Sequence, residues 1–95
     1  MTVTCCIRYI IDPFQRDAFE AYAKAWTTII PANGGDLIGY FLPHEGTNNV
    51  ALALISFPSL AAYEIYRQKA AADPDCQAAV RYYEQTKCFL SYERS

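Results

Sequence analysis

The single histidine of this chain is the first residue whose chemistry stands out. His44 lies in the turn-rich segment 43–49, and acid–base catalysis near neutral pH would fall most naturally to its imidazole. Glu45 follows it and could orient or tune the ring, although adjacent side chains often point apart. The alternative is a solvent-exposed pair in a loop, because residues of this kind favour surface turns.

Arg8 places a positive charge in the middle of the apolar segment 2–11. An unpaired buried cation is strongly unfavourable, so its guanidinium needs a partner or an opening. It could hold a carboxylate or another anion in a pocket. The alternative is a structural pair with Glu93 or another acidic residue across the sheet, since buried charges are usually paired within the protein.

Aromatic side chains are the third candidate group. Eight tyrosines supply phenolic donors on apolar bodies. Those that could line a cavity together with the single tryptophan are Tyr9, Trp26, Tyr40, Tyr66 and Tyr92. Such a pocket would suit a planar, apolar small molecule such as an aromatic metabolite. The alternative is that each ring packs in the core or at an interface.

The sequence predicts neither a metal site nor a cofactor. Cys5 and Cys6 are neighbours on an expected strand, so their side chains point to opposite faces and cannot both ligate one metal. Cys76 and Cys88 add no Cys-x-x-Cys spacing, and we expect all four thiols to be reduced. Gly-rich phosphate loops, Gly-x-Ser-x-Gly elbows, His-Glu-x-x-His motifs and a helical haem ligand are also missing from the sequence.

Composition limits the class of protein. Hydrophobic residues make up 53% of the 95 residues and charged residues 19%, which is typical of one folded domain covering 1–95. The net charge of −2 and the scattered basic residues argue against nucleic acid as a partner. The sequence contains no apolar stretch of about 20 residues that could span a membrane. Arg8 also interrupts the N-terminal apolar run, unlike a signal peptide, so we expect a cytoplasmic protein.

Residue periodicity predicts the element order β-α-β-β-α-α-β. The expected strands cover 2–11, 36–42, 50–57 and 87–93, and the expected helices begin at 13, 58–59 and 73–74. Asp12 and Asp73 each precede a proline, a combination typical of a helix start. Pro31 and the following Gly34-Gly35 are expected to end the first helix near residue 30.

This order is the split βαβ pattern with one additional helix before the last strand. It predicts an α+β fold of the ferredoxin-like type, with a four-stranded antiparallel sheet and helices on one face. The 43–49 loop should lie at the same end of the sheet as Asp12 and the end of the second helix. A mouth between sheet and helices could open there.

The third strand predicts a homodimer. Val50, Leu52 and Leu54 lie on one of its sides, and the residues on the other side, Ala51, Ala53, Ile55 and Phe57, are equally apolar. The chain has no element left to cover the second face, so a second copy packing sheet against sheet is the simplest cover. The alternative is a monomer whose small alanine side chains tolerate exposure.

Three segments resemble the NIPSNAP family, within the wider group of dimeric α/β-barrel proteins. They are IRYIIDPFQRDAFEAYAKAW, GYFLPHEGTNNVALALISFPSLAAYEIYR and the closing SYERS, which together cover essentially the whole chain. The resemblance implies a dimer in which two sheets face each other as a barrel with helices outside. Relatives in the wider group include cofactor-independent monooxygenases, isomerases, dehalogenating and haem-handling enzymes and proteins without assigned activity, so the resemblance fixes no reaction.

Two functions therefore remain open. The first is a dimeric small-molecule-binding protein, which as an enzyme would be a cofactor-independent oxygenase or isomerase. His44 would be its acid–base group, with Arg8 and the tyrosines lining its pocket. The second is a noncatalytic interaction module, in which the 43–49 loop and the third helix matter more than any pocket. A fully packed interior would favour the second function.

Overall fold

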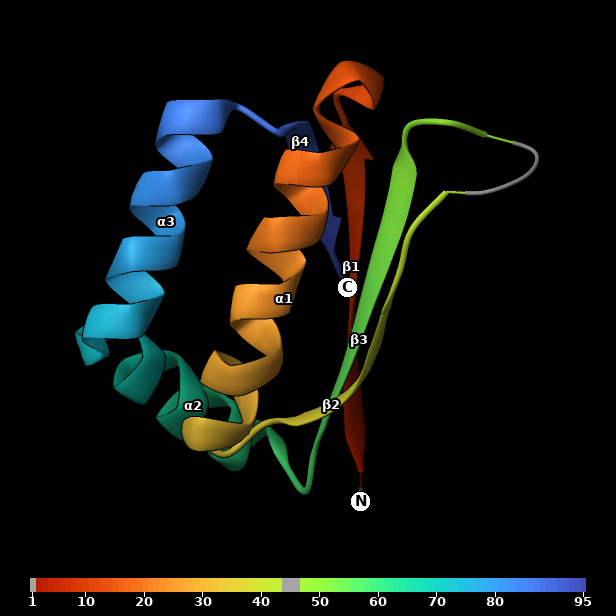
Figure 1. Ribbon diagram of the computed structural model, residues 1–95. Coiled ribbons are helices and arrows are strands. Elements are labelled where there is room, and N and C mark those ends of the chain that lie inside the picture. The colour runs from red at the N-terminus through yellow and green to blue at the C-terminus, as the bar shows by residue number, and fades with distance from the viewer. Residues whose placement is uncertain (1, 44–46) are drawn as a thin grey trace.

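The computed structural model describes residues 2–43 and 47–95 and has the predicted βαββααβ order (Figure 1). A short 3₁₀ turn, η1 (Pro13–Gln15), joins the first strand to the first helix. The strands are β1 (Val3–Ile11), β2 (Asp36–Phe41), β3 (Val50–Phe57) and β4 (Phe89–Arg94). The helices are α1 (Arg16–Ala32), α2 (Leu60–Ala72) and α3 (Pro74–Thr86).

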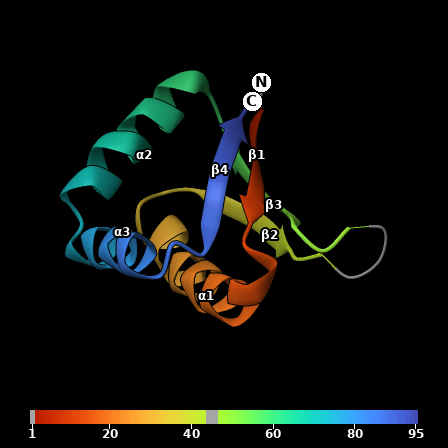
Figure 2. The same cartoon turned by 90° about the horizontal axis from the view of Figure 1, so that it is seen from above.

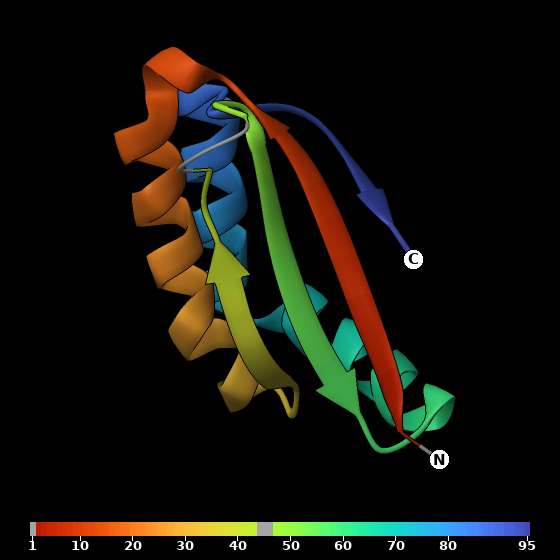
Figure 3. The ribbon, with the colours of Figure 1, turned by 90° about the vertical axis from the view of Figure 1, so that its right-hand side faces the viewer.

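The strands form one antiparallel sheet in the order β2-β3-β1-β4. The central strand β1 pairs with β3 from Val3 opposite Phe57 to Ile10 opposite Val50. The three helices lie on one face of this sheet, and Figure 3 shows the strands in front of them. The ferredoxin-like α+β fold predicted from the sequence is confirmed.

Two predicted capping residues, Ser59 and Asp73, start α2 and α3. Asp12 caps η1 instead, and α1 begins later than expected, at Arg16, without a side-chain cap. Asp12 accepts a hydrogen bond from the Phe14 amide at 2.9 Å, and Asp73 accepts one from the Asp75 amide at 2.8 Å. Ser59 caps α2 in the same manner. These side chains satisfy amide groups that have no partner within the first helical turn.

The expected end of α1 at Pro31 is wrong, because the helix continues to Ala32. A proline in the last turn removes only one backbone hydrogen bond, the one to the Thr27 carbonyl, and the amide of Asn33 still donates to the carbonyls of Ile29 and Ile30 at 3.2 Å. Gly34 then adopts a φ of +97°, a left-handed conformation that glycine reaches without strain. The chain thereby leaves α1 in the direction of β2.

The expected position of the end of α2 is also wrong. Asp73, the residue after α2, accepts a hydrogen bond at 2.8 Å from the side chain of Asn33, which ends α1. Asp12 lies at the other end of the sheet, where the Ile11 amide donates to the carbonyl of Asn49 at 2.8 Å. The third helix brings the chain back to that end, which is why β4 begins beside Asp12 (Figure 1).

The hydrophobic core lies between the sheet and the three helices, and all three helices lie on the same side of the sheet (Figure 2). Its fully buried side chains include Phe19, Phe57 and Ile11. The outer face of the sheet carries half-buried Leu52 and Leu54, with no element of the described chain covering them. Within the described residues, no helix is long and apolar enough to cross a membrane.

Candidate functional site

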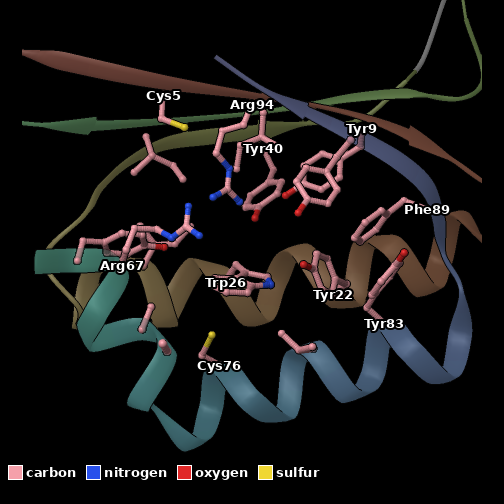
Figure 4. A pocket seen from close by; sticks show the side chains of 18 of the residues that line it. Cys5, Tyr9, Tyr22, Trp26, Tyr40, Arg67, Cys76, Tyr83, Phe89 and Arg94 are labelled. Atoms are coloured by element: carbon pink, nitrogen blue, oxygen red, sulfur yellow. The ribbon is translucent and has the colours of Figure 1, made fainter. Parts of the chain in front are cut away.

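A cavity of about 370 Å³ lies between the sheet and the helices (Figure 4). Its walls come from all four strands and all three helices of the described chain. Its exposed lining residues are Arg67 and Ala71 on α2, Val80 on α3, and Tyr92 and Arg94 on β4. The cavity therefore opens between these three elements. Its volume falls at the lower end of the range of about 300–1,000 Å³ that is usual for small-molecule sites.

Strand alternation decides which side chains reach the cavity. In β1, Ile7 and Tyr9 point towards the helices, and Arg8 between them points to the outer face. Antiparallel pairing carries this alternation into β4, where Tyr92 lies opposite Tyr9 and Arg94 lies opposite Ile7. Both β4 side chains therefore share the cavity side of the sheet.

The structure brings the five predicted aromatic residues together. All five of them line the cavity, namely Tyr9, Trp26, Tyr40, Tyr66 and Tyr92. They come from β1, α1, β2, α2 and β4, so only the tertiary fold places them side by side. His44 and Glu45 lie outside the described residues.

Arg8 does not line the cavity, and the hypothesis that it holds a ligand there is corrected. Its side chain lies on the outer face of the sheet, 3.9 Å from a carboxylate oxygen of Glu93. The predicted Arg8–Glu93 pair is thereby confirmed. Both side chains are largely exposed, at 47% and 80%, so the pair contributes little to stability.

Two arginines missed by the sequence analysis line the cavity instead. Arg67 Nη1 donates a hydrogen bond to Tyr63 Oη at 3.0 Å. Arg94 on β4 interacts with the same Tyr63 phenol and lies over the Tyr92 ring, 5.7 Å from its centre. Burial lowers the pKa of Arg94, but its hydrogen bond and charge interaction with Tyr63 offset this and raise the pKa overall. The Arg94 guanidinium is therefore charged.

Sequence signals for these two arginines were present. Arg94 follows Tyr92 by two residues on one strand, so the two side chains share a face. Arg67 follows Tyr63 by four residues on one helix, which is the spacing of neighbouring side chains on a helical surface.

Three phenols of the cavity, those of Tyr9, Tyr40 and Tyr66, remain protonated at neutral pH. Burial raises the pKa of Tyr9 to about 12, although a hydrogen bond from Tyr40 counteracts part of the effect. Burial also raises the pKa of Tyr66 to about 12 and that of Tyr40 further. Burial raises the pKa of the Cys5 thiol as well. These groups consequently act as hydrogen-bond donors and not as bases near pH 7.

Trp26 adds one more donor. Its indole Nε1 is buried and has no hydrogen-bond partner among the described residues. An indole N–H can only donate, and a buried donor without an acceptor is unfavourable. A ligand oxygen in the cavity would satisfy it.

The described lining therefore combines apolar rings, neutral donors and two cations. Such groups bind a small molecule and stabilise negative charge on its oxygen atoms. Among the lining rings, Tyr83 and Phe89 stack with their ring centres 3.8 Å apart. Among the described residues, no cluster of three His, Cys, Asp or Glu side chains is placed to hold a metal ion.

Comparison with known proteins places the fold in a family. The NIPSNAP family model matches residues 5–95. A NIPSNAP family protein of Agrobacterium tumefaciens superposes with a TM-score of 0.85 at 21% identity, covering 100% of this chain and 90% of the other. An uncharacterised NIPSNAP-like domain protein of Burkholderia xenovorans gives 0.83 at 22% identity, covering 99% and 81%.

A more distant structure belongs to a candidate antibiotic biosynthesis monooxygenase of Caulobacter crescentus. It superposes with a TM-score of 0.73 at 14% identity and covers 99% of this chain and 85% of the other. No curated protein matches the sequence. At these identities the structural likeness concerns the fold alone.

Proposed function

This chain belongs to the NIPSNAP family, and from that premise we propose that it binds a small, partly aromatic molecule between its sheet and its helices. The observation that carries the proposal is the open cavity of about 370 Å³ with its aromatic lining. A noncatalytic interaction module needs no such space. A single ligand of one to three rings suits a cavity of this size.

The finer proposal is a cofactor-independent monooxygenase or isomerase. Both reactions begin with loss of a proton from the substrate and pass through an enolate or phenolate. In the monooxygenase, the substrate anion itself supplies electrons to dioxygen. The donors of Trp26, Tyr40 and Arg94 would stabilise the oxyanion in a partly water-excluded site. His44 stays the proposed base, and the name of the Caulobacter neighbour supports the oxygenase alternative.

We further propose that two copies pack through the outer face of the sheet. Supporting this, Leu52 and Leu54 are only half-buried in one chain, and Phe41 beside them is 50% exposed. Burial of this apolar surface against a second copy would stabilise the pair. A cytoplasmic location stays a prediction from the sequence.

Native mass spectrometry of the purified protein and an Ala71→Trp variant would test ligand binding. Ala71 is an exposed lining residue on α2, so a tryptophan there fills the cavity without replacing a core side chain. We expect the wild type to carry a discrete small molecule and the variant to lose it. Ala72→Trp is the matched control, because Ala72 is exposed on the same helix and does not line the cavity. Equal ligand retention by Ala71→Trp would refute a site in this cavity.

The noncatalytic dimeric interaction module is the second candidate. Exposed apolar side chains on α2 favour it, since Leu60 is 62% and Ile65 is 54% exposed outside the cavity. The same experiment separates the two candidates. A wild-type protein that carries no small molecule, and binds none from a library of aromatic compounds, would favour the interaction module.

A further inference from the structure

We propose that the cavity selects a small anion, namely an aromatic carboxylate. The carboxylate of this ligand would lie at the cationic end of the cavity, formed by Arg67 and Arg94, and its ring would lie along the aromatic wall, formed by Tyr22, Tyr83 and Phe89. This inference rests on the proposed function of the cavity and specifies the chemical class of its ligand. It follows from the charge of the lining, from the layout of the two ends, and from one unsatisfied donor.

Charge comes first. Two guanidinium groups, those of Arg67 and Arg94, line the same end of the cavity (Figure 4). Arg67 donates a hydrogen bond to Tyr63 Oη at 3.0 Å, and Arg94 lies over the Tyr92 ring. Neither forms an ion pair with an acidic residue in the described part of the chain, where the ion pairs are Arg8–Glu93 and Lys24–Glu20. No described lining residue is acidic. The cationic end of the cavity therefore has no negative charge of its own to balance it.

Both guanidinium groups present several N–H donors, and no acidic side chain of the described lining accepts from them. An anionic oxygen at this end of the cavity would accept hydrogen bonds from both groups and supply the missing negative charge. Arginine forks match the two oxygens of a carboxylate, which makes a carboxylate the best-fitting anion. The pair of arginines thus recognises charge and shape together.

The layout of the cavity then places the body of the ligand. Figure 4 shows Arg67 and Arg94 towards one end and Tyr22, Tyr83 and Phe89 towards the other. Phe89 and Tyr83 form a flat stacked pair, with 14° between their planes. A planar ring would lie against this wall while its carboxylate reaches the arginines.

Trp26 adds a third point of recognition. Its unpaired Nε1 lies on the α1 side of the cavity, between the two ends in Figure 4. A carbonyl or hydroxyl oxygen on the ligand, apart from the carboxylate, would accept from it. The best ligand is therefore an aromatic acid with a second oxygen on its ring system.

Isothermal titration calorimetry with 2-naphthoate and its neutral analogue 2-naphthamide tests the inference. We expect the wild type to bind naphthoate about tenfold more tightly than naphthamide, or better, as the loss of a charged hydrogen bond implies. Arg94→Gln and Arg67→Gln should each weaken naphthoate binding by about tenfold and leave naphthamide within about twofold. Arg8→Gln is the matched control, because that guanidinium lies on the outer face, and it should change neither affinity.

The single tryptophan locates the ligand in the same samples. Its one indole N–H signal in a ¹H–¹⁵N spectrum should shift when naphthoate binds. Equal affinity for acid and amide, with the indole signal shifting for both, would overturn the anion inference and leave the small-molecule site standing. Absence of binding by either probe, with the indole signal unmoved and no mass carried by the purified protein, would count against the site itself.

Discussion

Replacing Leu54 with lysine should dissociate the proposed homodimer while leaving the fold of each chain intact. Leu54 lies in the middle of β3 on the outer face, opposite Cys6 of β1 and Gly39 of β2. Neither neighbour is an acidic or basic residue, so the new ammonium group has no like charge directly opposite it. Leu52 is less suitable, because it lies opposite Arg8.

The expected magnitude follows from burial and symmetry. In one chain Leu54 is half-buried, and the aliphatic stem of a lysine covers much of the same surface, so each chain loses about 1 kcal/mol or less. In a sheet-to-sheet dimer the ammonium group would be buried without a partner, at about 2–3 kcal/mol per copy after relaxation. A twofold interface contains the change twice, which gives about 4–6 kcal/mol, or a dissociation constant raised by about 10³–10⁴-fold.

Sedimentation equilibrium over a micromolar dilution series would measure this constant, with thermal unfolding by circular dichroism to check that the fold persists. Ile65→Lys is the matched control, since Ile65 is 54% exposed on α2 and lies on the helical side of the sheet. A Leu54→Lys protein that dimerises as tightly as the wild type would refute packing through the outer face. A wild type that stays monomeric throughout the series would refute the dimer altogether.

Three further predictions concern the single chain and are read by thermal or denaturant unfolding. Lys87 ends α3 with a φ of 53°, so Lys87→Gly should remove left-handed strain and raise the melting temperature by about 4 °C, after glycine's greater unfolded-state entropy is subtracted. Asn33→Ala removes the 2.8 Å bond to Asp73 and should lower the melting temperature by about 5 °C. The hydrogen bond from Asn33 lowers the pKa of Asp73 in the folded protein. The stability that this bond contributes is therefore present above the pKa of Asp73 in the unfolded chain and is lost as the pH falls through its pKa in the folded protein. In Asn33→Ala, the free energy of unfolding should decrease less steeply over this acidic range. Burial raises the pKa of Tyr9 to about 12, so stability should fall by about 1.4 kcal/mol per pH unit from about pH 10 to 12, and Tyr9→Phe should remove this contribution from the alkaline slope.

Much of the fold could be predicted because its signals are local. Asp12 and Asp73 are followed by prolines and cap helices directly, without help from distant residues. The strand 50–57 was predicted with its exact bounds, since its apolar run ends abruptly at a Pro-Ser helix start. Capping and strand patterns depend only on residues within one helical turn or one strand, and these residues can be read directly from the sequence.

The errors concern features that depend on distant contacts. Pro31 remains helical although it lacks an amide donor, and the side chain of Asn33, which follows the helix, donates to Asp73 forty residues away. The end of α2 lies at the opposite end of the sheet from the one expected, because the residues of α2 carry no signal of its direction relative to the sheet. The path of α3 back along the molecule is a matter of packing and has no local signature.

The charge of the cavity depends on a single choice of register. In the observed pairing of β1 with β4, Arg94 lies opposite Ile7 and faces the helices, while Glu93 faces outwards. A shift of one residue would turn Glu93 into the cavity and Arg94 out of it, since successive side chains of a strand alternate between faces. Backbone bonds of 3.0 and 2.9 Å between Cys6 and Ser95, and the irregularity after Ile10, hold the observed register. The sequence predicts the fourth strand at 87–93, which stops before Arg94, so the pattern shows neither the last strand residue nor the register that turns Arg94 towards the cavity.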